Sequence, residues 1–155
     1  MTERNLIVMV GLPYSGKSTW ARAQHLPIVS ADAIRLAMGH KYYAPLEDLV
    51  WTLAKMLVRS LFLAGNRKVI ADGCHATQKR RDFWKPMTLA CSGVEDGWTT
   101  EFLHIPTDAS ECCRRAEAAG DRDILGVIDR MAGEMDFTGC EAMTTYRRGD
   151  GDVSG

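Results

Sequence analysis

The chain has 155 residues, of which 46% are hydrophobic and 25% charged, and its formal net charge at pH 7 is −1. This length suits one domain with its own core, and the near-zero charge excludes a global field that would attract nucleic acid or an anionic membrane. The apolar runs are far shorter than a membrane span, and the amino end lacks the pattern of a signal peptide. We therefore expect a cytoplasmic protein that does not associate with membranes.

The cysteines indicate reduced thiols. They are odd in number, and they show neither C-x-x-C pairing nor a metal-ligand rhythm with the four histidines. We expect no zinc site. The five cysteines are Cys74, Cys91, Cys112, Cys113 and Cys140.

The first segment of the chain carries its most specific motif. Residues 11–18 read Gly-Leu-Pro-Tyr-Ser-Gly-Lys-Ser and fit the Walker A pattern G-x-x-x-x-G-K-[ST] in full. An apolar strand at 6–10 is predicted before it and a helix beginning at 19–23 after it. The glycines let several backbone N–H groups point at one anion, which the positive end of the helix also attracts.

This motif predicts a binding site for the phosphates of ATP. Lys17 would reach the β- and γ-phosphates, and the hydroxyl of Ser18 would be a Mg²⁺ ligand. An ordinary glycine-rich turn is the alternative. The residues expected to bind the nucleotide are Gly11, Pro13, Tyr14, Ser15, Gly16, Lys17, Ser18 and Thr19.

A second strand is predicted at 27–29, ending at Ser30, and a helix follows it with Ser30 or Asp32 as its N-cap and Gly39 near its end. Asp32 and Arg35 are three residues apart, so both can face one cleft. Asp32 could accept the proton of an attacking hydroxyl, and Arg35 could bind the acceptor or steady Asp32. The alternative is a capping aspartate beside a solvated arginine.

Residues 41–45 are predicted to form a loop, and 46–64 a helix, because Leu49, Leu53, Met56, Leu57 and Leu61 recur at helical spacing. Three aromatic residues in this region could stack on a nucleobase, although core packing is the expectation we favour. They are Tyr42, Tyr43 and Trp51.

The third strand is predicted at 68–72, with Asp72 at its carboxyl end. A carboxylate there can hold Mg²⁺ beside Ser18, directly or through water. The alternative is turn formation by the Asp72–Gly73 pair. A helix is expected over 77–89, with Phe83, Trp84 and Met87 on one side and a solvated cluster of Lys79, Arg80 and Arg81. His75 is not assigned a role.

A fourth strand is predicted at 99–105, and helices at 108–118 and 124–135 flank a break at Gly120. The helices and the break between them could form a mobile lid that excludes water. Phosphoryl transfer needs cations around the moving phosphate, so Arg115 and Arg122 are candidate catalytic residues, with Arg114 a weaker one. A solvated helix face with an ion pair to Glu111 or Glu117 is the alternative.

The alternation of strands and helices predicts an α/β fold with a central, mostly parallel sheet. Together with the Walker A motif this resembles the three-layer P-loop NTPase fold, nucleotide-kinase-like, with a helical lid. We expect one kinase domain over residues 1–137. The tail at 138–155 loses its periodicity and is expected to be partly disordered. The sequence does not indicate an oligomeric state.

Residues 15–22, followed by Asp32-x-x-Arg35, resemble the kinase domain of polynucleotide 5′-hydroxyl kinases and the wider group of P-loop kinases. The resemblance covers about residues 5–135, and Asp72 and the arginine-rich lid follow in the matching order. It implies that Asp32 is the general base, that Arg35 contacts the acceptor and that a lid arginine stabilises the transferring phosphate. Tyr14 stands where that family usually has glycine.

These features predict an ATP- and Mg²⁺-dependent kinase that transfers the γ-phosphate to an acceptor hydroxyl, which we expect to be the 5′-hydroxyl of a polynucleotide or nucleotide. One alternative is a kinase of a small metabolite, such as a sugar acid, a shikimate-like compound or an antibiotic. Another is a nucleotide-dependent switch without enzymatic activity. A GTPase is disfavoured because no Asn-Lys-x-Asp element is present.

Overall fold

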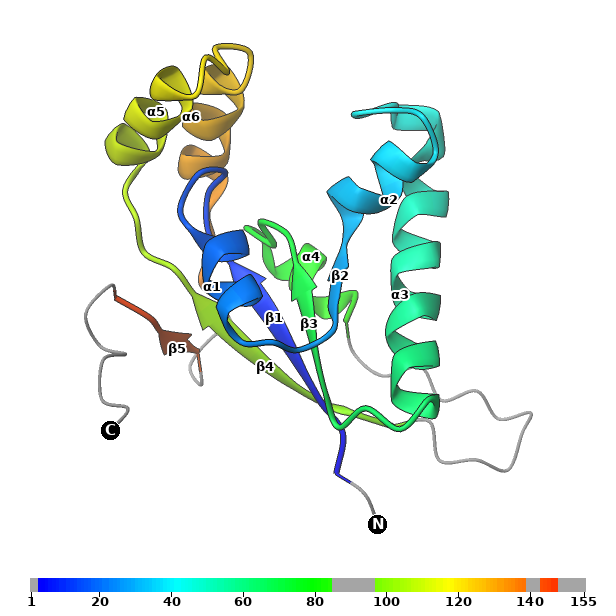
Figure 1. Ribbon diagram of the computed structural model, residues 1–155. Coiled ribbons are helices and arrows are strands. Elements are labelled where there is room, and N and C mark those ends of the chain that lie inside the picture. The colour runs from blue at the N-terminus through cyan, green and yellow to red at the C-terminus, as the bar shows by residue number, and fades with distance from the viewer. Residues whose placement is uncertain (1–2, 85–96, 139–142, 148–155) are drawn as a thin grey trace.

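A computed structural model describes residues 3–84, 97–138 and 143–147 of the chain. Strands and helices alternate along most of it (Figure 1). The strands are β1 (Asn5–Val10), β2 (Ile28–Ser30), β3 (Lys68–Asp72), β4 (Thr99–His104) and β5 (Thr144–Thr145). The helices are α1 (Lys17–Ala23), α2 (Ala31–Ala37), the short 3₁₀ helix η1 (Ala44–Leu46), α3 (Glu47–Leu63), α4 (Gln78–Asp82), α5 (Ala109–Ala118) and α6 (Leu125–Glu134).

The five strands form one parallel sheet in the order β2-β3-β1-β4-β5. β1 lies in the middle, and its Leu6 is in register with Val69 of β3 and with Thr100 of β4. Parallel strands bring all their carboxyl ends to one edge of the sheet, where ligands bind in open α/β folds. The predicted α/β fold with a mostly parallel sheet is confirmed.

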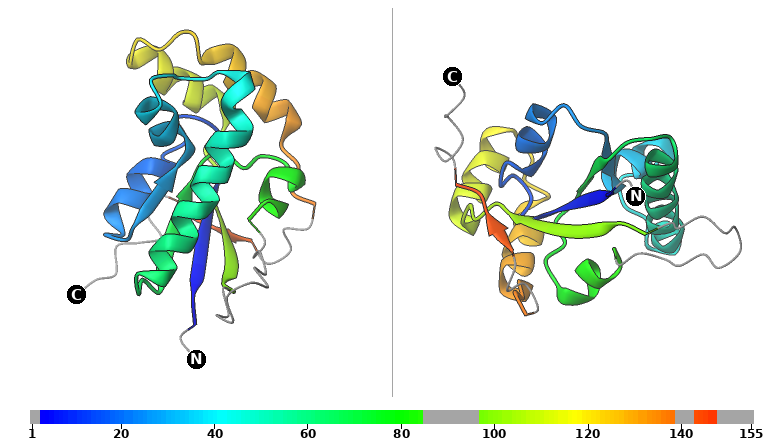
Figure 2. Two further views of the ribbon diagram at one scale, coloured as in Figure 1. Left: turned by 90° about the vertical axis from the view of Figure 1, so that its right-hand side faces the viewer. Right: turned by 90° about the horizontal axis from the view of Figure 1, so that it is seen from below.

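Side chains of β1 alternate between two cores on the two faces of the sheet. Leu6 and Val8 belong to a core that includes residues of α3, whereas Ile7 and Met9 pack with Ala21 of α1. Figure 2 shows the helices on both sides of the strands. This three-layer arrangement buries β1 on both faces, which explains why its sequence is an unbroken apolar run.

The face of helix α3 that packs on the sheet is not the face whose apolar spacing predicted the helix. Its buried residues are Val50, Ala54, Val58 and Phe62, while the stripe from Leu49 to Leu57 stays exposed. Both faces carry apolar residues at helical spacing, so periodicity predicts the helix without choosing its buried side. The smaller Val and Ala side chains allow the helix to lie close to the sheet.

Ser30, at the end of β2, is the N-cap of α2, because its Oγ accepts a hydrogen bond from the N–H of Ala33 at 3.3 Å. Asp32 is therefore free of a capping role and lies in the first turn of the helix. Thr77 and Asp108 cap α4 and α5 in the same way. Each of these caps satisfies one of the backbone N–H groups that a helix start leaves unpaired.

The expected solvated cluster at 79–81 is wrong for Arg81, which is only 2% exposed. Its Nη1 donates to the carbonyl oxygen of His75 at 3.0 Å, and its Nη2 donates to the carbonyl oxygens of Asp136 and Thr138. Arg81 thus fastens the segment after α6 to the turn after β3. Lys79 and Arg80 are exposed, as predicted.

Two short elements were not predicted: η1, inside the expected loop, and β5, which extends the sheet from the expected tail. Part of the helix expected at 77–89 lies outside the described residues, as do Met87, Cys91, Cys140 and the last eight residues. None of the helices that the structure describes is both long and apolar enough to cross a membrane.

Candidate active site

The loop between β1 and α1 has the backbone geometry of a phosphate cradle. Gly16 has a φ of 104°, a left-handed conformation that favours glycine, and no side chain caps the helix that follows it. A Cβ atom on Gly11 would lie 2.9 Å from the Oγ of Ser15 and 3.0 Å from the carbonyl oxygen of Ile105. The unpaired N–H groups of the first turn are therefore left available to an anion.

Lys17 lies under this loop with only 6% of its surface exposed. Its Nζ donates to the carbonyl oxygen of Leu12 at 2.6 Å and to the Oγ of Ser15 at 3.4 Å. These contacts hold a buried ammonium inside the loop, where a bound phosphate would be its natural counter-charge.

Ser18 and Asp72 come from different elements and meet at the end of the sheet. The hydroxyl of Ser18 donates to Oδ2 of Asp72 at 2.7 Å. The other carboxylate oxygen of Asp72 is buried and has no hydrogen-bond partner among the described residues. A buried carboxylate oxygen without a donor, beside a hydroxyl and a phosphate cradle, fits the oxygen ligand set that Mg²⁺ prefers.

Asp32 enters the same region from the neighbouring strand. Ser30 is in register with Asp72 across β2 and β3, so Asp32 lies two residues beyond the end of that pairing. Burial raises the pKa of the Cys74 thiol, Lys17 opposes this rise, and the carboxylates of Asp32 and Asp72 add to it. The thiol of Cys74 therefore experiences the charges of all three predicted functional residues.

Arg35 is held between two carboxylates. Its Nε and Nη2 each donate to Glu47 at 2.7 Å, and its Nη1 donates to Oδ1 of Asp32 at 2.6 Å. The side chains of Arg35 and Glu47 are 14% and 12% exposed, whereas that of Asp32 is 87% exposed. The hydrogen bonds from Arg35 hold the pKa of Glu47 below its usual value. This arrangement fixes Arg35 and leaves Asp32 facing solvent.

Aromatic and cationic side chains surround this ion pair. The guanidinium of Arg35 lies 5.9 Å from the ring of Tyr42 and 6.0 Å from that of Trp51, and Arg80 lies 5.0 Å from the ring of Trp51. Tyr42 and Tyr43 are 69% and 51% exposed, so the expectation that they pack in the core is wrong. Only Trp51 packs against the core, as expected.

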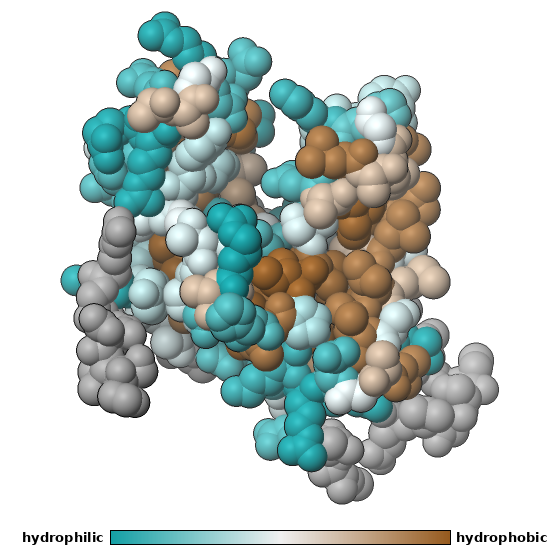
Figure 3. Space-filling view, in the orientation of Figure 1, coloured by the Kyte–Doolittle hydropathy of each residue, from teal (hydrophilic) through white to brown (hydrophobic). Residues whose placement is uncertain are grey.

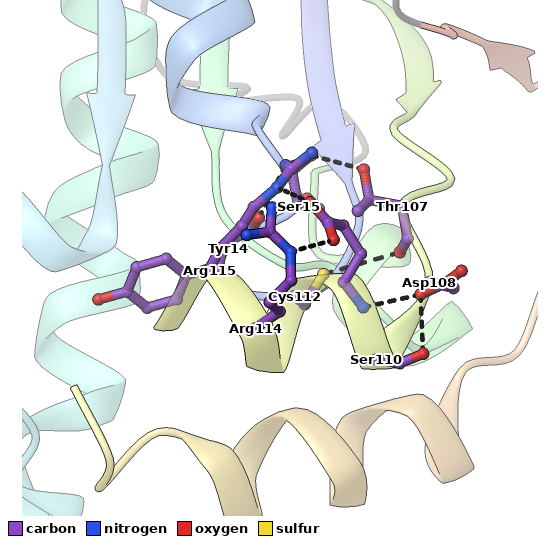
Figure 4. Close-up of polar contacts among 9 residues, drawn as sticks. Tyr14, Ser15, Thr107, Asp108, Ser110, Cys112, Arg114 and Arg115 are labelled. Carbon is purple, nitrogen blue, oxygen red and sulfur yellow. Dashed lines mark hydrogen bonds and ion pairs between the residues drawn. The ribbon is translucent and has the colours of Figure 1, made fainter. Parts of the chain in front are cut away.

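The lid formed by α5 and α6 contacts the phosphate loop through Arg115 (Figure 4). Its Nη1 donates to the carbonyl oxygens of Tyr14 and Ser15, both at 3.2 Å, and its Nε donates to Glu111 at 3.0 Å. Thr107, in the loop after β4, also donates to the carbonyl oxygen of Ser15, at 2.7 Å. A cation therefore lies against the loop that would bind the phosphates.

The other two arginines of the lid lie differently. Arg114 is 68% exposed and forms an ion pair with Glu111. Hydrogen bonds from Arg114 and Arg115 lower the pKa of Glu111 to about 2. Arg122 is exposed, and its side chain makes no hydrogen bond or ion pair with the part of the chain that the structure describes. Of the two candidates for the lid arginine, only Arg115 contacts the phosphate loop.

No motif singled out two residues of this site, Glu47 and Thr107, and the contact of Tyr14 with the lid was not predicted either. Glu47 had no signal, because its partner Arg35 is twelve positions away in the sequence. Thr107 follows a predicted strand end, which is a position where functional residues gather.

The surface of the molecule is hollowed between α5–α6 and the upper ends of α2 and α3 (Figure 3).

The parallel sheet, the phosphate loop and the helical lid together define a P-loop kinase fold. The family model described as an AAA domain (AAA_33) matches residues 6–134, and the chain belongs to this family. The resemblance to polynucleotide kinases found in the sequence is thereby supported at the level of fold. No curated protein matches the chain in sequence.

Solved structures share the fold at low sequence identity. A chain of the Pnkp1/Rnl/Hen1 RNA repair complex is 17% identical, with a TM-score of 0.69, over 89% of this chain and 46% of that one. A gluconokinase from Sinorhizobium meliloti is 14% identical, with a TM-score of 0.60, over 94% and 83% of the two chains. A sugar kinase from Janibacter sp. is 19% identical, with a TM-score of 0.57, over 93% and 83%. This chain thus spans about half the length of the RNA repair protein that it matches.

Proposed function

We propose that the protein is an ATP-dependent kinase that transfers the γ-phosphate to the 5′-hydroxyl of a polynucleotide. The observation that carries this proposal is the convergence of three groups at one edge of the sheet: the phosphate loop with Lys17, the Ser18–Asp72 pair, and the Asp32–Arg35 pair. A phosphate cradle beside a carboxylate that faces solvent is what transfer to an alcohol requires.

In this proposal the phosphate loop and Lys17 bind the triphosphate. Ser18 and Asp72 would hold Mg²⁺. When bound, this ion would neutralise negative charge on the β- and γ-phosphate oxygens. Arg115 donates to two carbonyl oxygens of the loop, and from there it could also donate to an oxygen of a bound phosphate. Its role is to stabilise the charge of the phosphoryl group during transfer.

Asp32 is the proposed general base. One of its oxygens accepts a hydrogen bond from Arg35, which fixes the carboxylate, and its high exposure leaves the other oxygen accessible to an acceptor hydroxyl. Arg35 donates to both Glu47 and Asp32 and its side chain is only 14% exposed, so we assign it to positioning Asp32 instead of direct contact with the acceptor. The acceptor proton would pass to Asp32 as the hydroxyl oxygen bonds to the γ-phosphorus and ADP leaves.

The acceptor class is argued from the exposed aromatic residues near Asp32. Tyr42 and Tyr43 lie on the surface after α2, and the ring of Tyr43 stacks on that of His40 at 5.5 Å. Exposed rings with a nearby cation such as Arg80 can stack on bases and bind a phosphate backbone, independently of sequence. A sugar or another small alcohol carries neither a base to stack on these rings nor a phosphate backbone for the cation to bind.

The decisive experiment offers labelled ATP together with either 5′-hydroxyl oligonucleotides or a panel of small alcohols. We expect label on the 5′ end of the oligonucleotides. Asp32→Asn should lower turnover by about 10²–10⁴ while ATP binding is retained. Asp48→Asn, an exposed acid elsewhere on the surface, is the matched control and should keep full activity.

Other outcomes separate the alternatives. Label on a small alcohol alone would identify a metabolite kinase, the class suggested by the names of the gluconokinase and sugar kinase that share the fold. A nucleotide-dependent switch predicts that no acceptor is labelled and that Asp32→Asn changes nothing that can be measured. Either result would end the polynucleotide kinase proposal.

A further inference from the structure

Helix α3 has a second apolar face that no described part of the chain covers. Its exposed residues, together with Leu36 on the neighbouring α2, are between 38% and 66% exposed. They gather on the right-hand side of the molecule in Figure 3, along α3. Below, "the α3 stripe" means Leu36, Leu49, Leu53, Met56, Leu57 and Leu63.

Burial of the α3 stripe would cost little desolvation free energy. Two polar residues lie within it, Thr52 and Ser60, and each hydroxyl already donates to the carbonyl oxygen four residues earlier, at 2.8 Å in both cases. Burial of this face would therefore leave neither hydroxyl without a partner. Contiguous exposed apolar patches of this kind are typical of interaction sites.

We propose that the α3 stripe is the interface of a symmetric homodimer in which the α3 helices of two copies pack antiparallel. The stripe is nearly self-complementary about a point between Met56 and Leu57. In that register Leu49 of one copy lies opposite the turn that holds Leu63 in the second, and Leu53 lies opposite the small Ser60. A twofold axis requires this kind of pairing, because the same patch must serve both copies.

The charges at the two ends of α3 favour the same orientation. Exposed Asp48 lies in the first turn of the helix, whereas exposed Arg67 and Lys68 follow its end. Antiparallel packing brings Asp48 of one copy towards the basic residues that follow the end of α3 in the other, and it opposes the two helix dipoles. Parallel packing would bring like charges together at both ends. This complementarity between the beginning of α3 and the residues that follow its end is why we assign the stripe to a second copy and not to a different protein.

The dimer leaves both phosphate loops open. The phosphate loop lies on the far side of α2 and β3 from α3 in Figure 1, and the stripe residues of α3 lie on the face of that helix opposite to its buried one. The inference therefore concerns assembly, and it does not depend on the proposed kinase activity.

The first test is the mass of the protein in solution, measured by sedimentation velocity from low to high micromolar concentration. We expect the full chain to sediment at twice the mass of one chain. Met56→Glu, at the centre of the stripe, should give a monomer with an unchanged circular dichroism spectrum, because its side chain is exposed. Phe137→Glu is the control: it places the same charge on an exposed apolar residue outside the stripe and should remain a dimer.

The orientation is tested with two variants that each disrupt the dimer. Leu49→Lys alone and Leu63→Glu alone should both be monomeric. Their equimolar mixture should form a heterodimer, because antiparallel packing places the new lysine of one chain beside the new glutamate of the other. Failure of the mixture to associate would exclude the antiparallel register. A wild-type chain that is monomeric throughout, or a dimer that survives Met56→Glu, would overturn the proposal.

Discussion

The hydroxyl of Tyr14, in the phosphate loop, donates a hydrogen bond to Oδ2 of Asp121, 2.9 Å away in the turn between α5 and α6. This hydrogen bond raises the pKa of the Tyr14 hydroxyl above its usual value. Tyr14 also has a φ of 62°, a left-handed conformation that is costly for a residue with a Cβ atom. A strained position in the loop therefore carries the side chain that joins the loop to the lid.

Loss of this tether should loosen the lid. We expect Tyr14→Phe, which keeps the ring and removes the hydroxyl, to raise the KM for ATP by roughly threefold, the range of one exposed hydrogen bond. In the absence of nucleotide, trypsin should cleave faster after Arg122, which lies next to Asp121. Tyr42→Phe removes a hydroxyl at an exposed site away from the lid and should change neither quantity. Equal cleavage rates in all three proteins would contradict a tether.

The two lid arginines should differ strongly in their effect on catalysis. Arg115 contacts the carbonyl oxygens of the phosphate loop, whereas Arg122 is exposed to solvent. If Arg115 stabilises the transferring phosphate, Arg115→Ala should lower kcat by about 10³-fold or more, as arginines in this role do. Arg122→Ala should lower kcat by less than about tenfold. Steady-state kinetics of both variants decides between them, and a larger loss for Arg122→Ala would reverse the assignment.

The fold could be predicted because its signals are local. The apolar run of β1, the Walker A pattern and the aspartate at the end of β3 each lie within a few residues, and the parallel sheet follows from the alternation of elements. Strand β5 was missed because two threonines carry no pattern, and they become a strand only by pairing with Leu103 and His104 of β4.

The candidate site could be predicted less completely, because side-chain partners are distant in sequence. The pairing of Ser18 with Asp72 spans 54 positions and was expected only because both residues lie at strand or helix ends. Arg35 with Glu47, and Tyr14 with Asp121, have no such marker. Periodicity also could not show that Arg81 is buried, since its burial depends on the carbonyl oxygens of a segment more than fifty residues away.

The pairing of Arg35 with Glu47 should matter for both stability and catalysis. Glu47→Gln would leave a largely buried guanidinium without its bidentate partner, so we expect a loss of roughly 1–3 kcal/mol in the free energy of unfolding. Asp48→Asn removes an exposed charge from the same turn of α3 and should change stability little. Urea unfolding of the two variants measures the difference. With Glu47 neutral, Arg35 should also move relative to Asp32 and position this carboxylate less well. The kcat should therefore fall while the KM for ATP is unchanged.

The last prediction concerns His75, which is buried in the core and has a φ of 46°. The indole N–H of Trp84 donates to its Nε2 at 2.8 Å, so Nδ1 carries the proton and donates to the carbonyl oxygen of Met9 at 2.6 Å. The neutral ring is thus fully satisfied. Burial lowers the pKa of His75 to about 4, against 6.5 for an exposed histidine.

Protonation of His75 therefore opposes folding. Between pH 6.5 and 4 the unfolded chain binds the proton and the folded chain does not, so this contribution to stability is complete above pH 6.5 and is lost as the pH falls towards 4. From pH 7 to pH 5 the free energy of unfolding should fall by about 2 kcal/mol on account of this residue. Urea unfolding at the two pH values measures the loss.

His75→Gln should lose less stability than the wild type between pH 7 and pH 5. The control is His104→Gln, since burial also lowers the pKa of this half-buried histidine, and it should remove only a smaller part of the pH dependence. If His75→Gln does not fold, an NMR titration of the wild-type imidazole answers the same question. A His75 that titrates near pH 6.5 in the folded protein would show that its ring is accessible to water, contrary to the packing around Trp84.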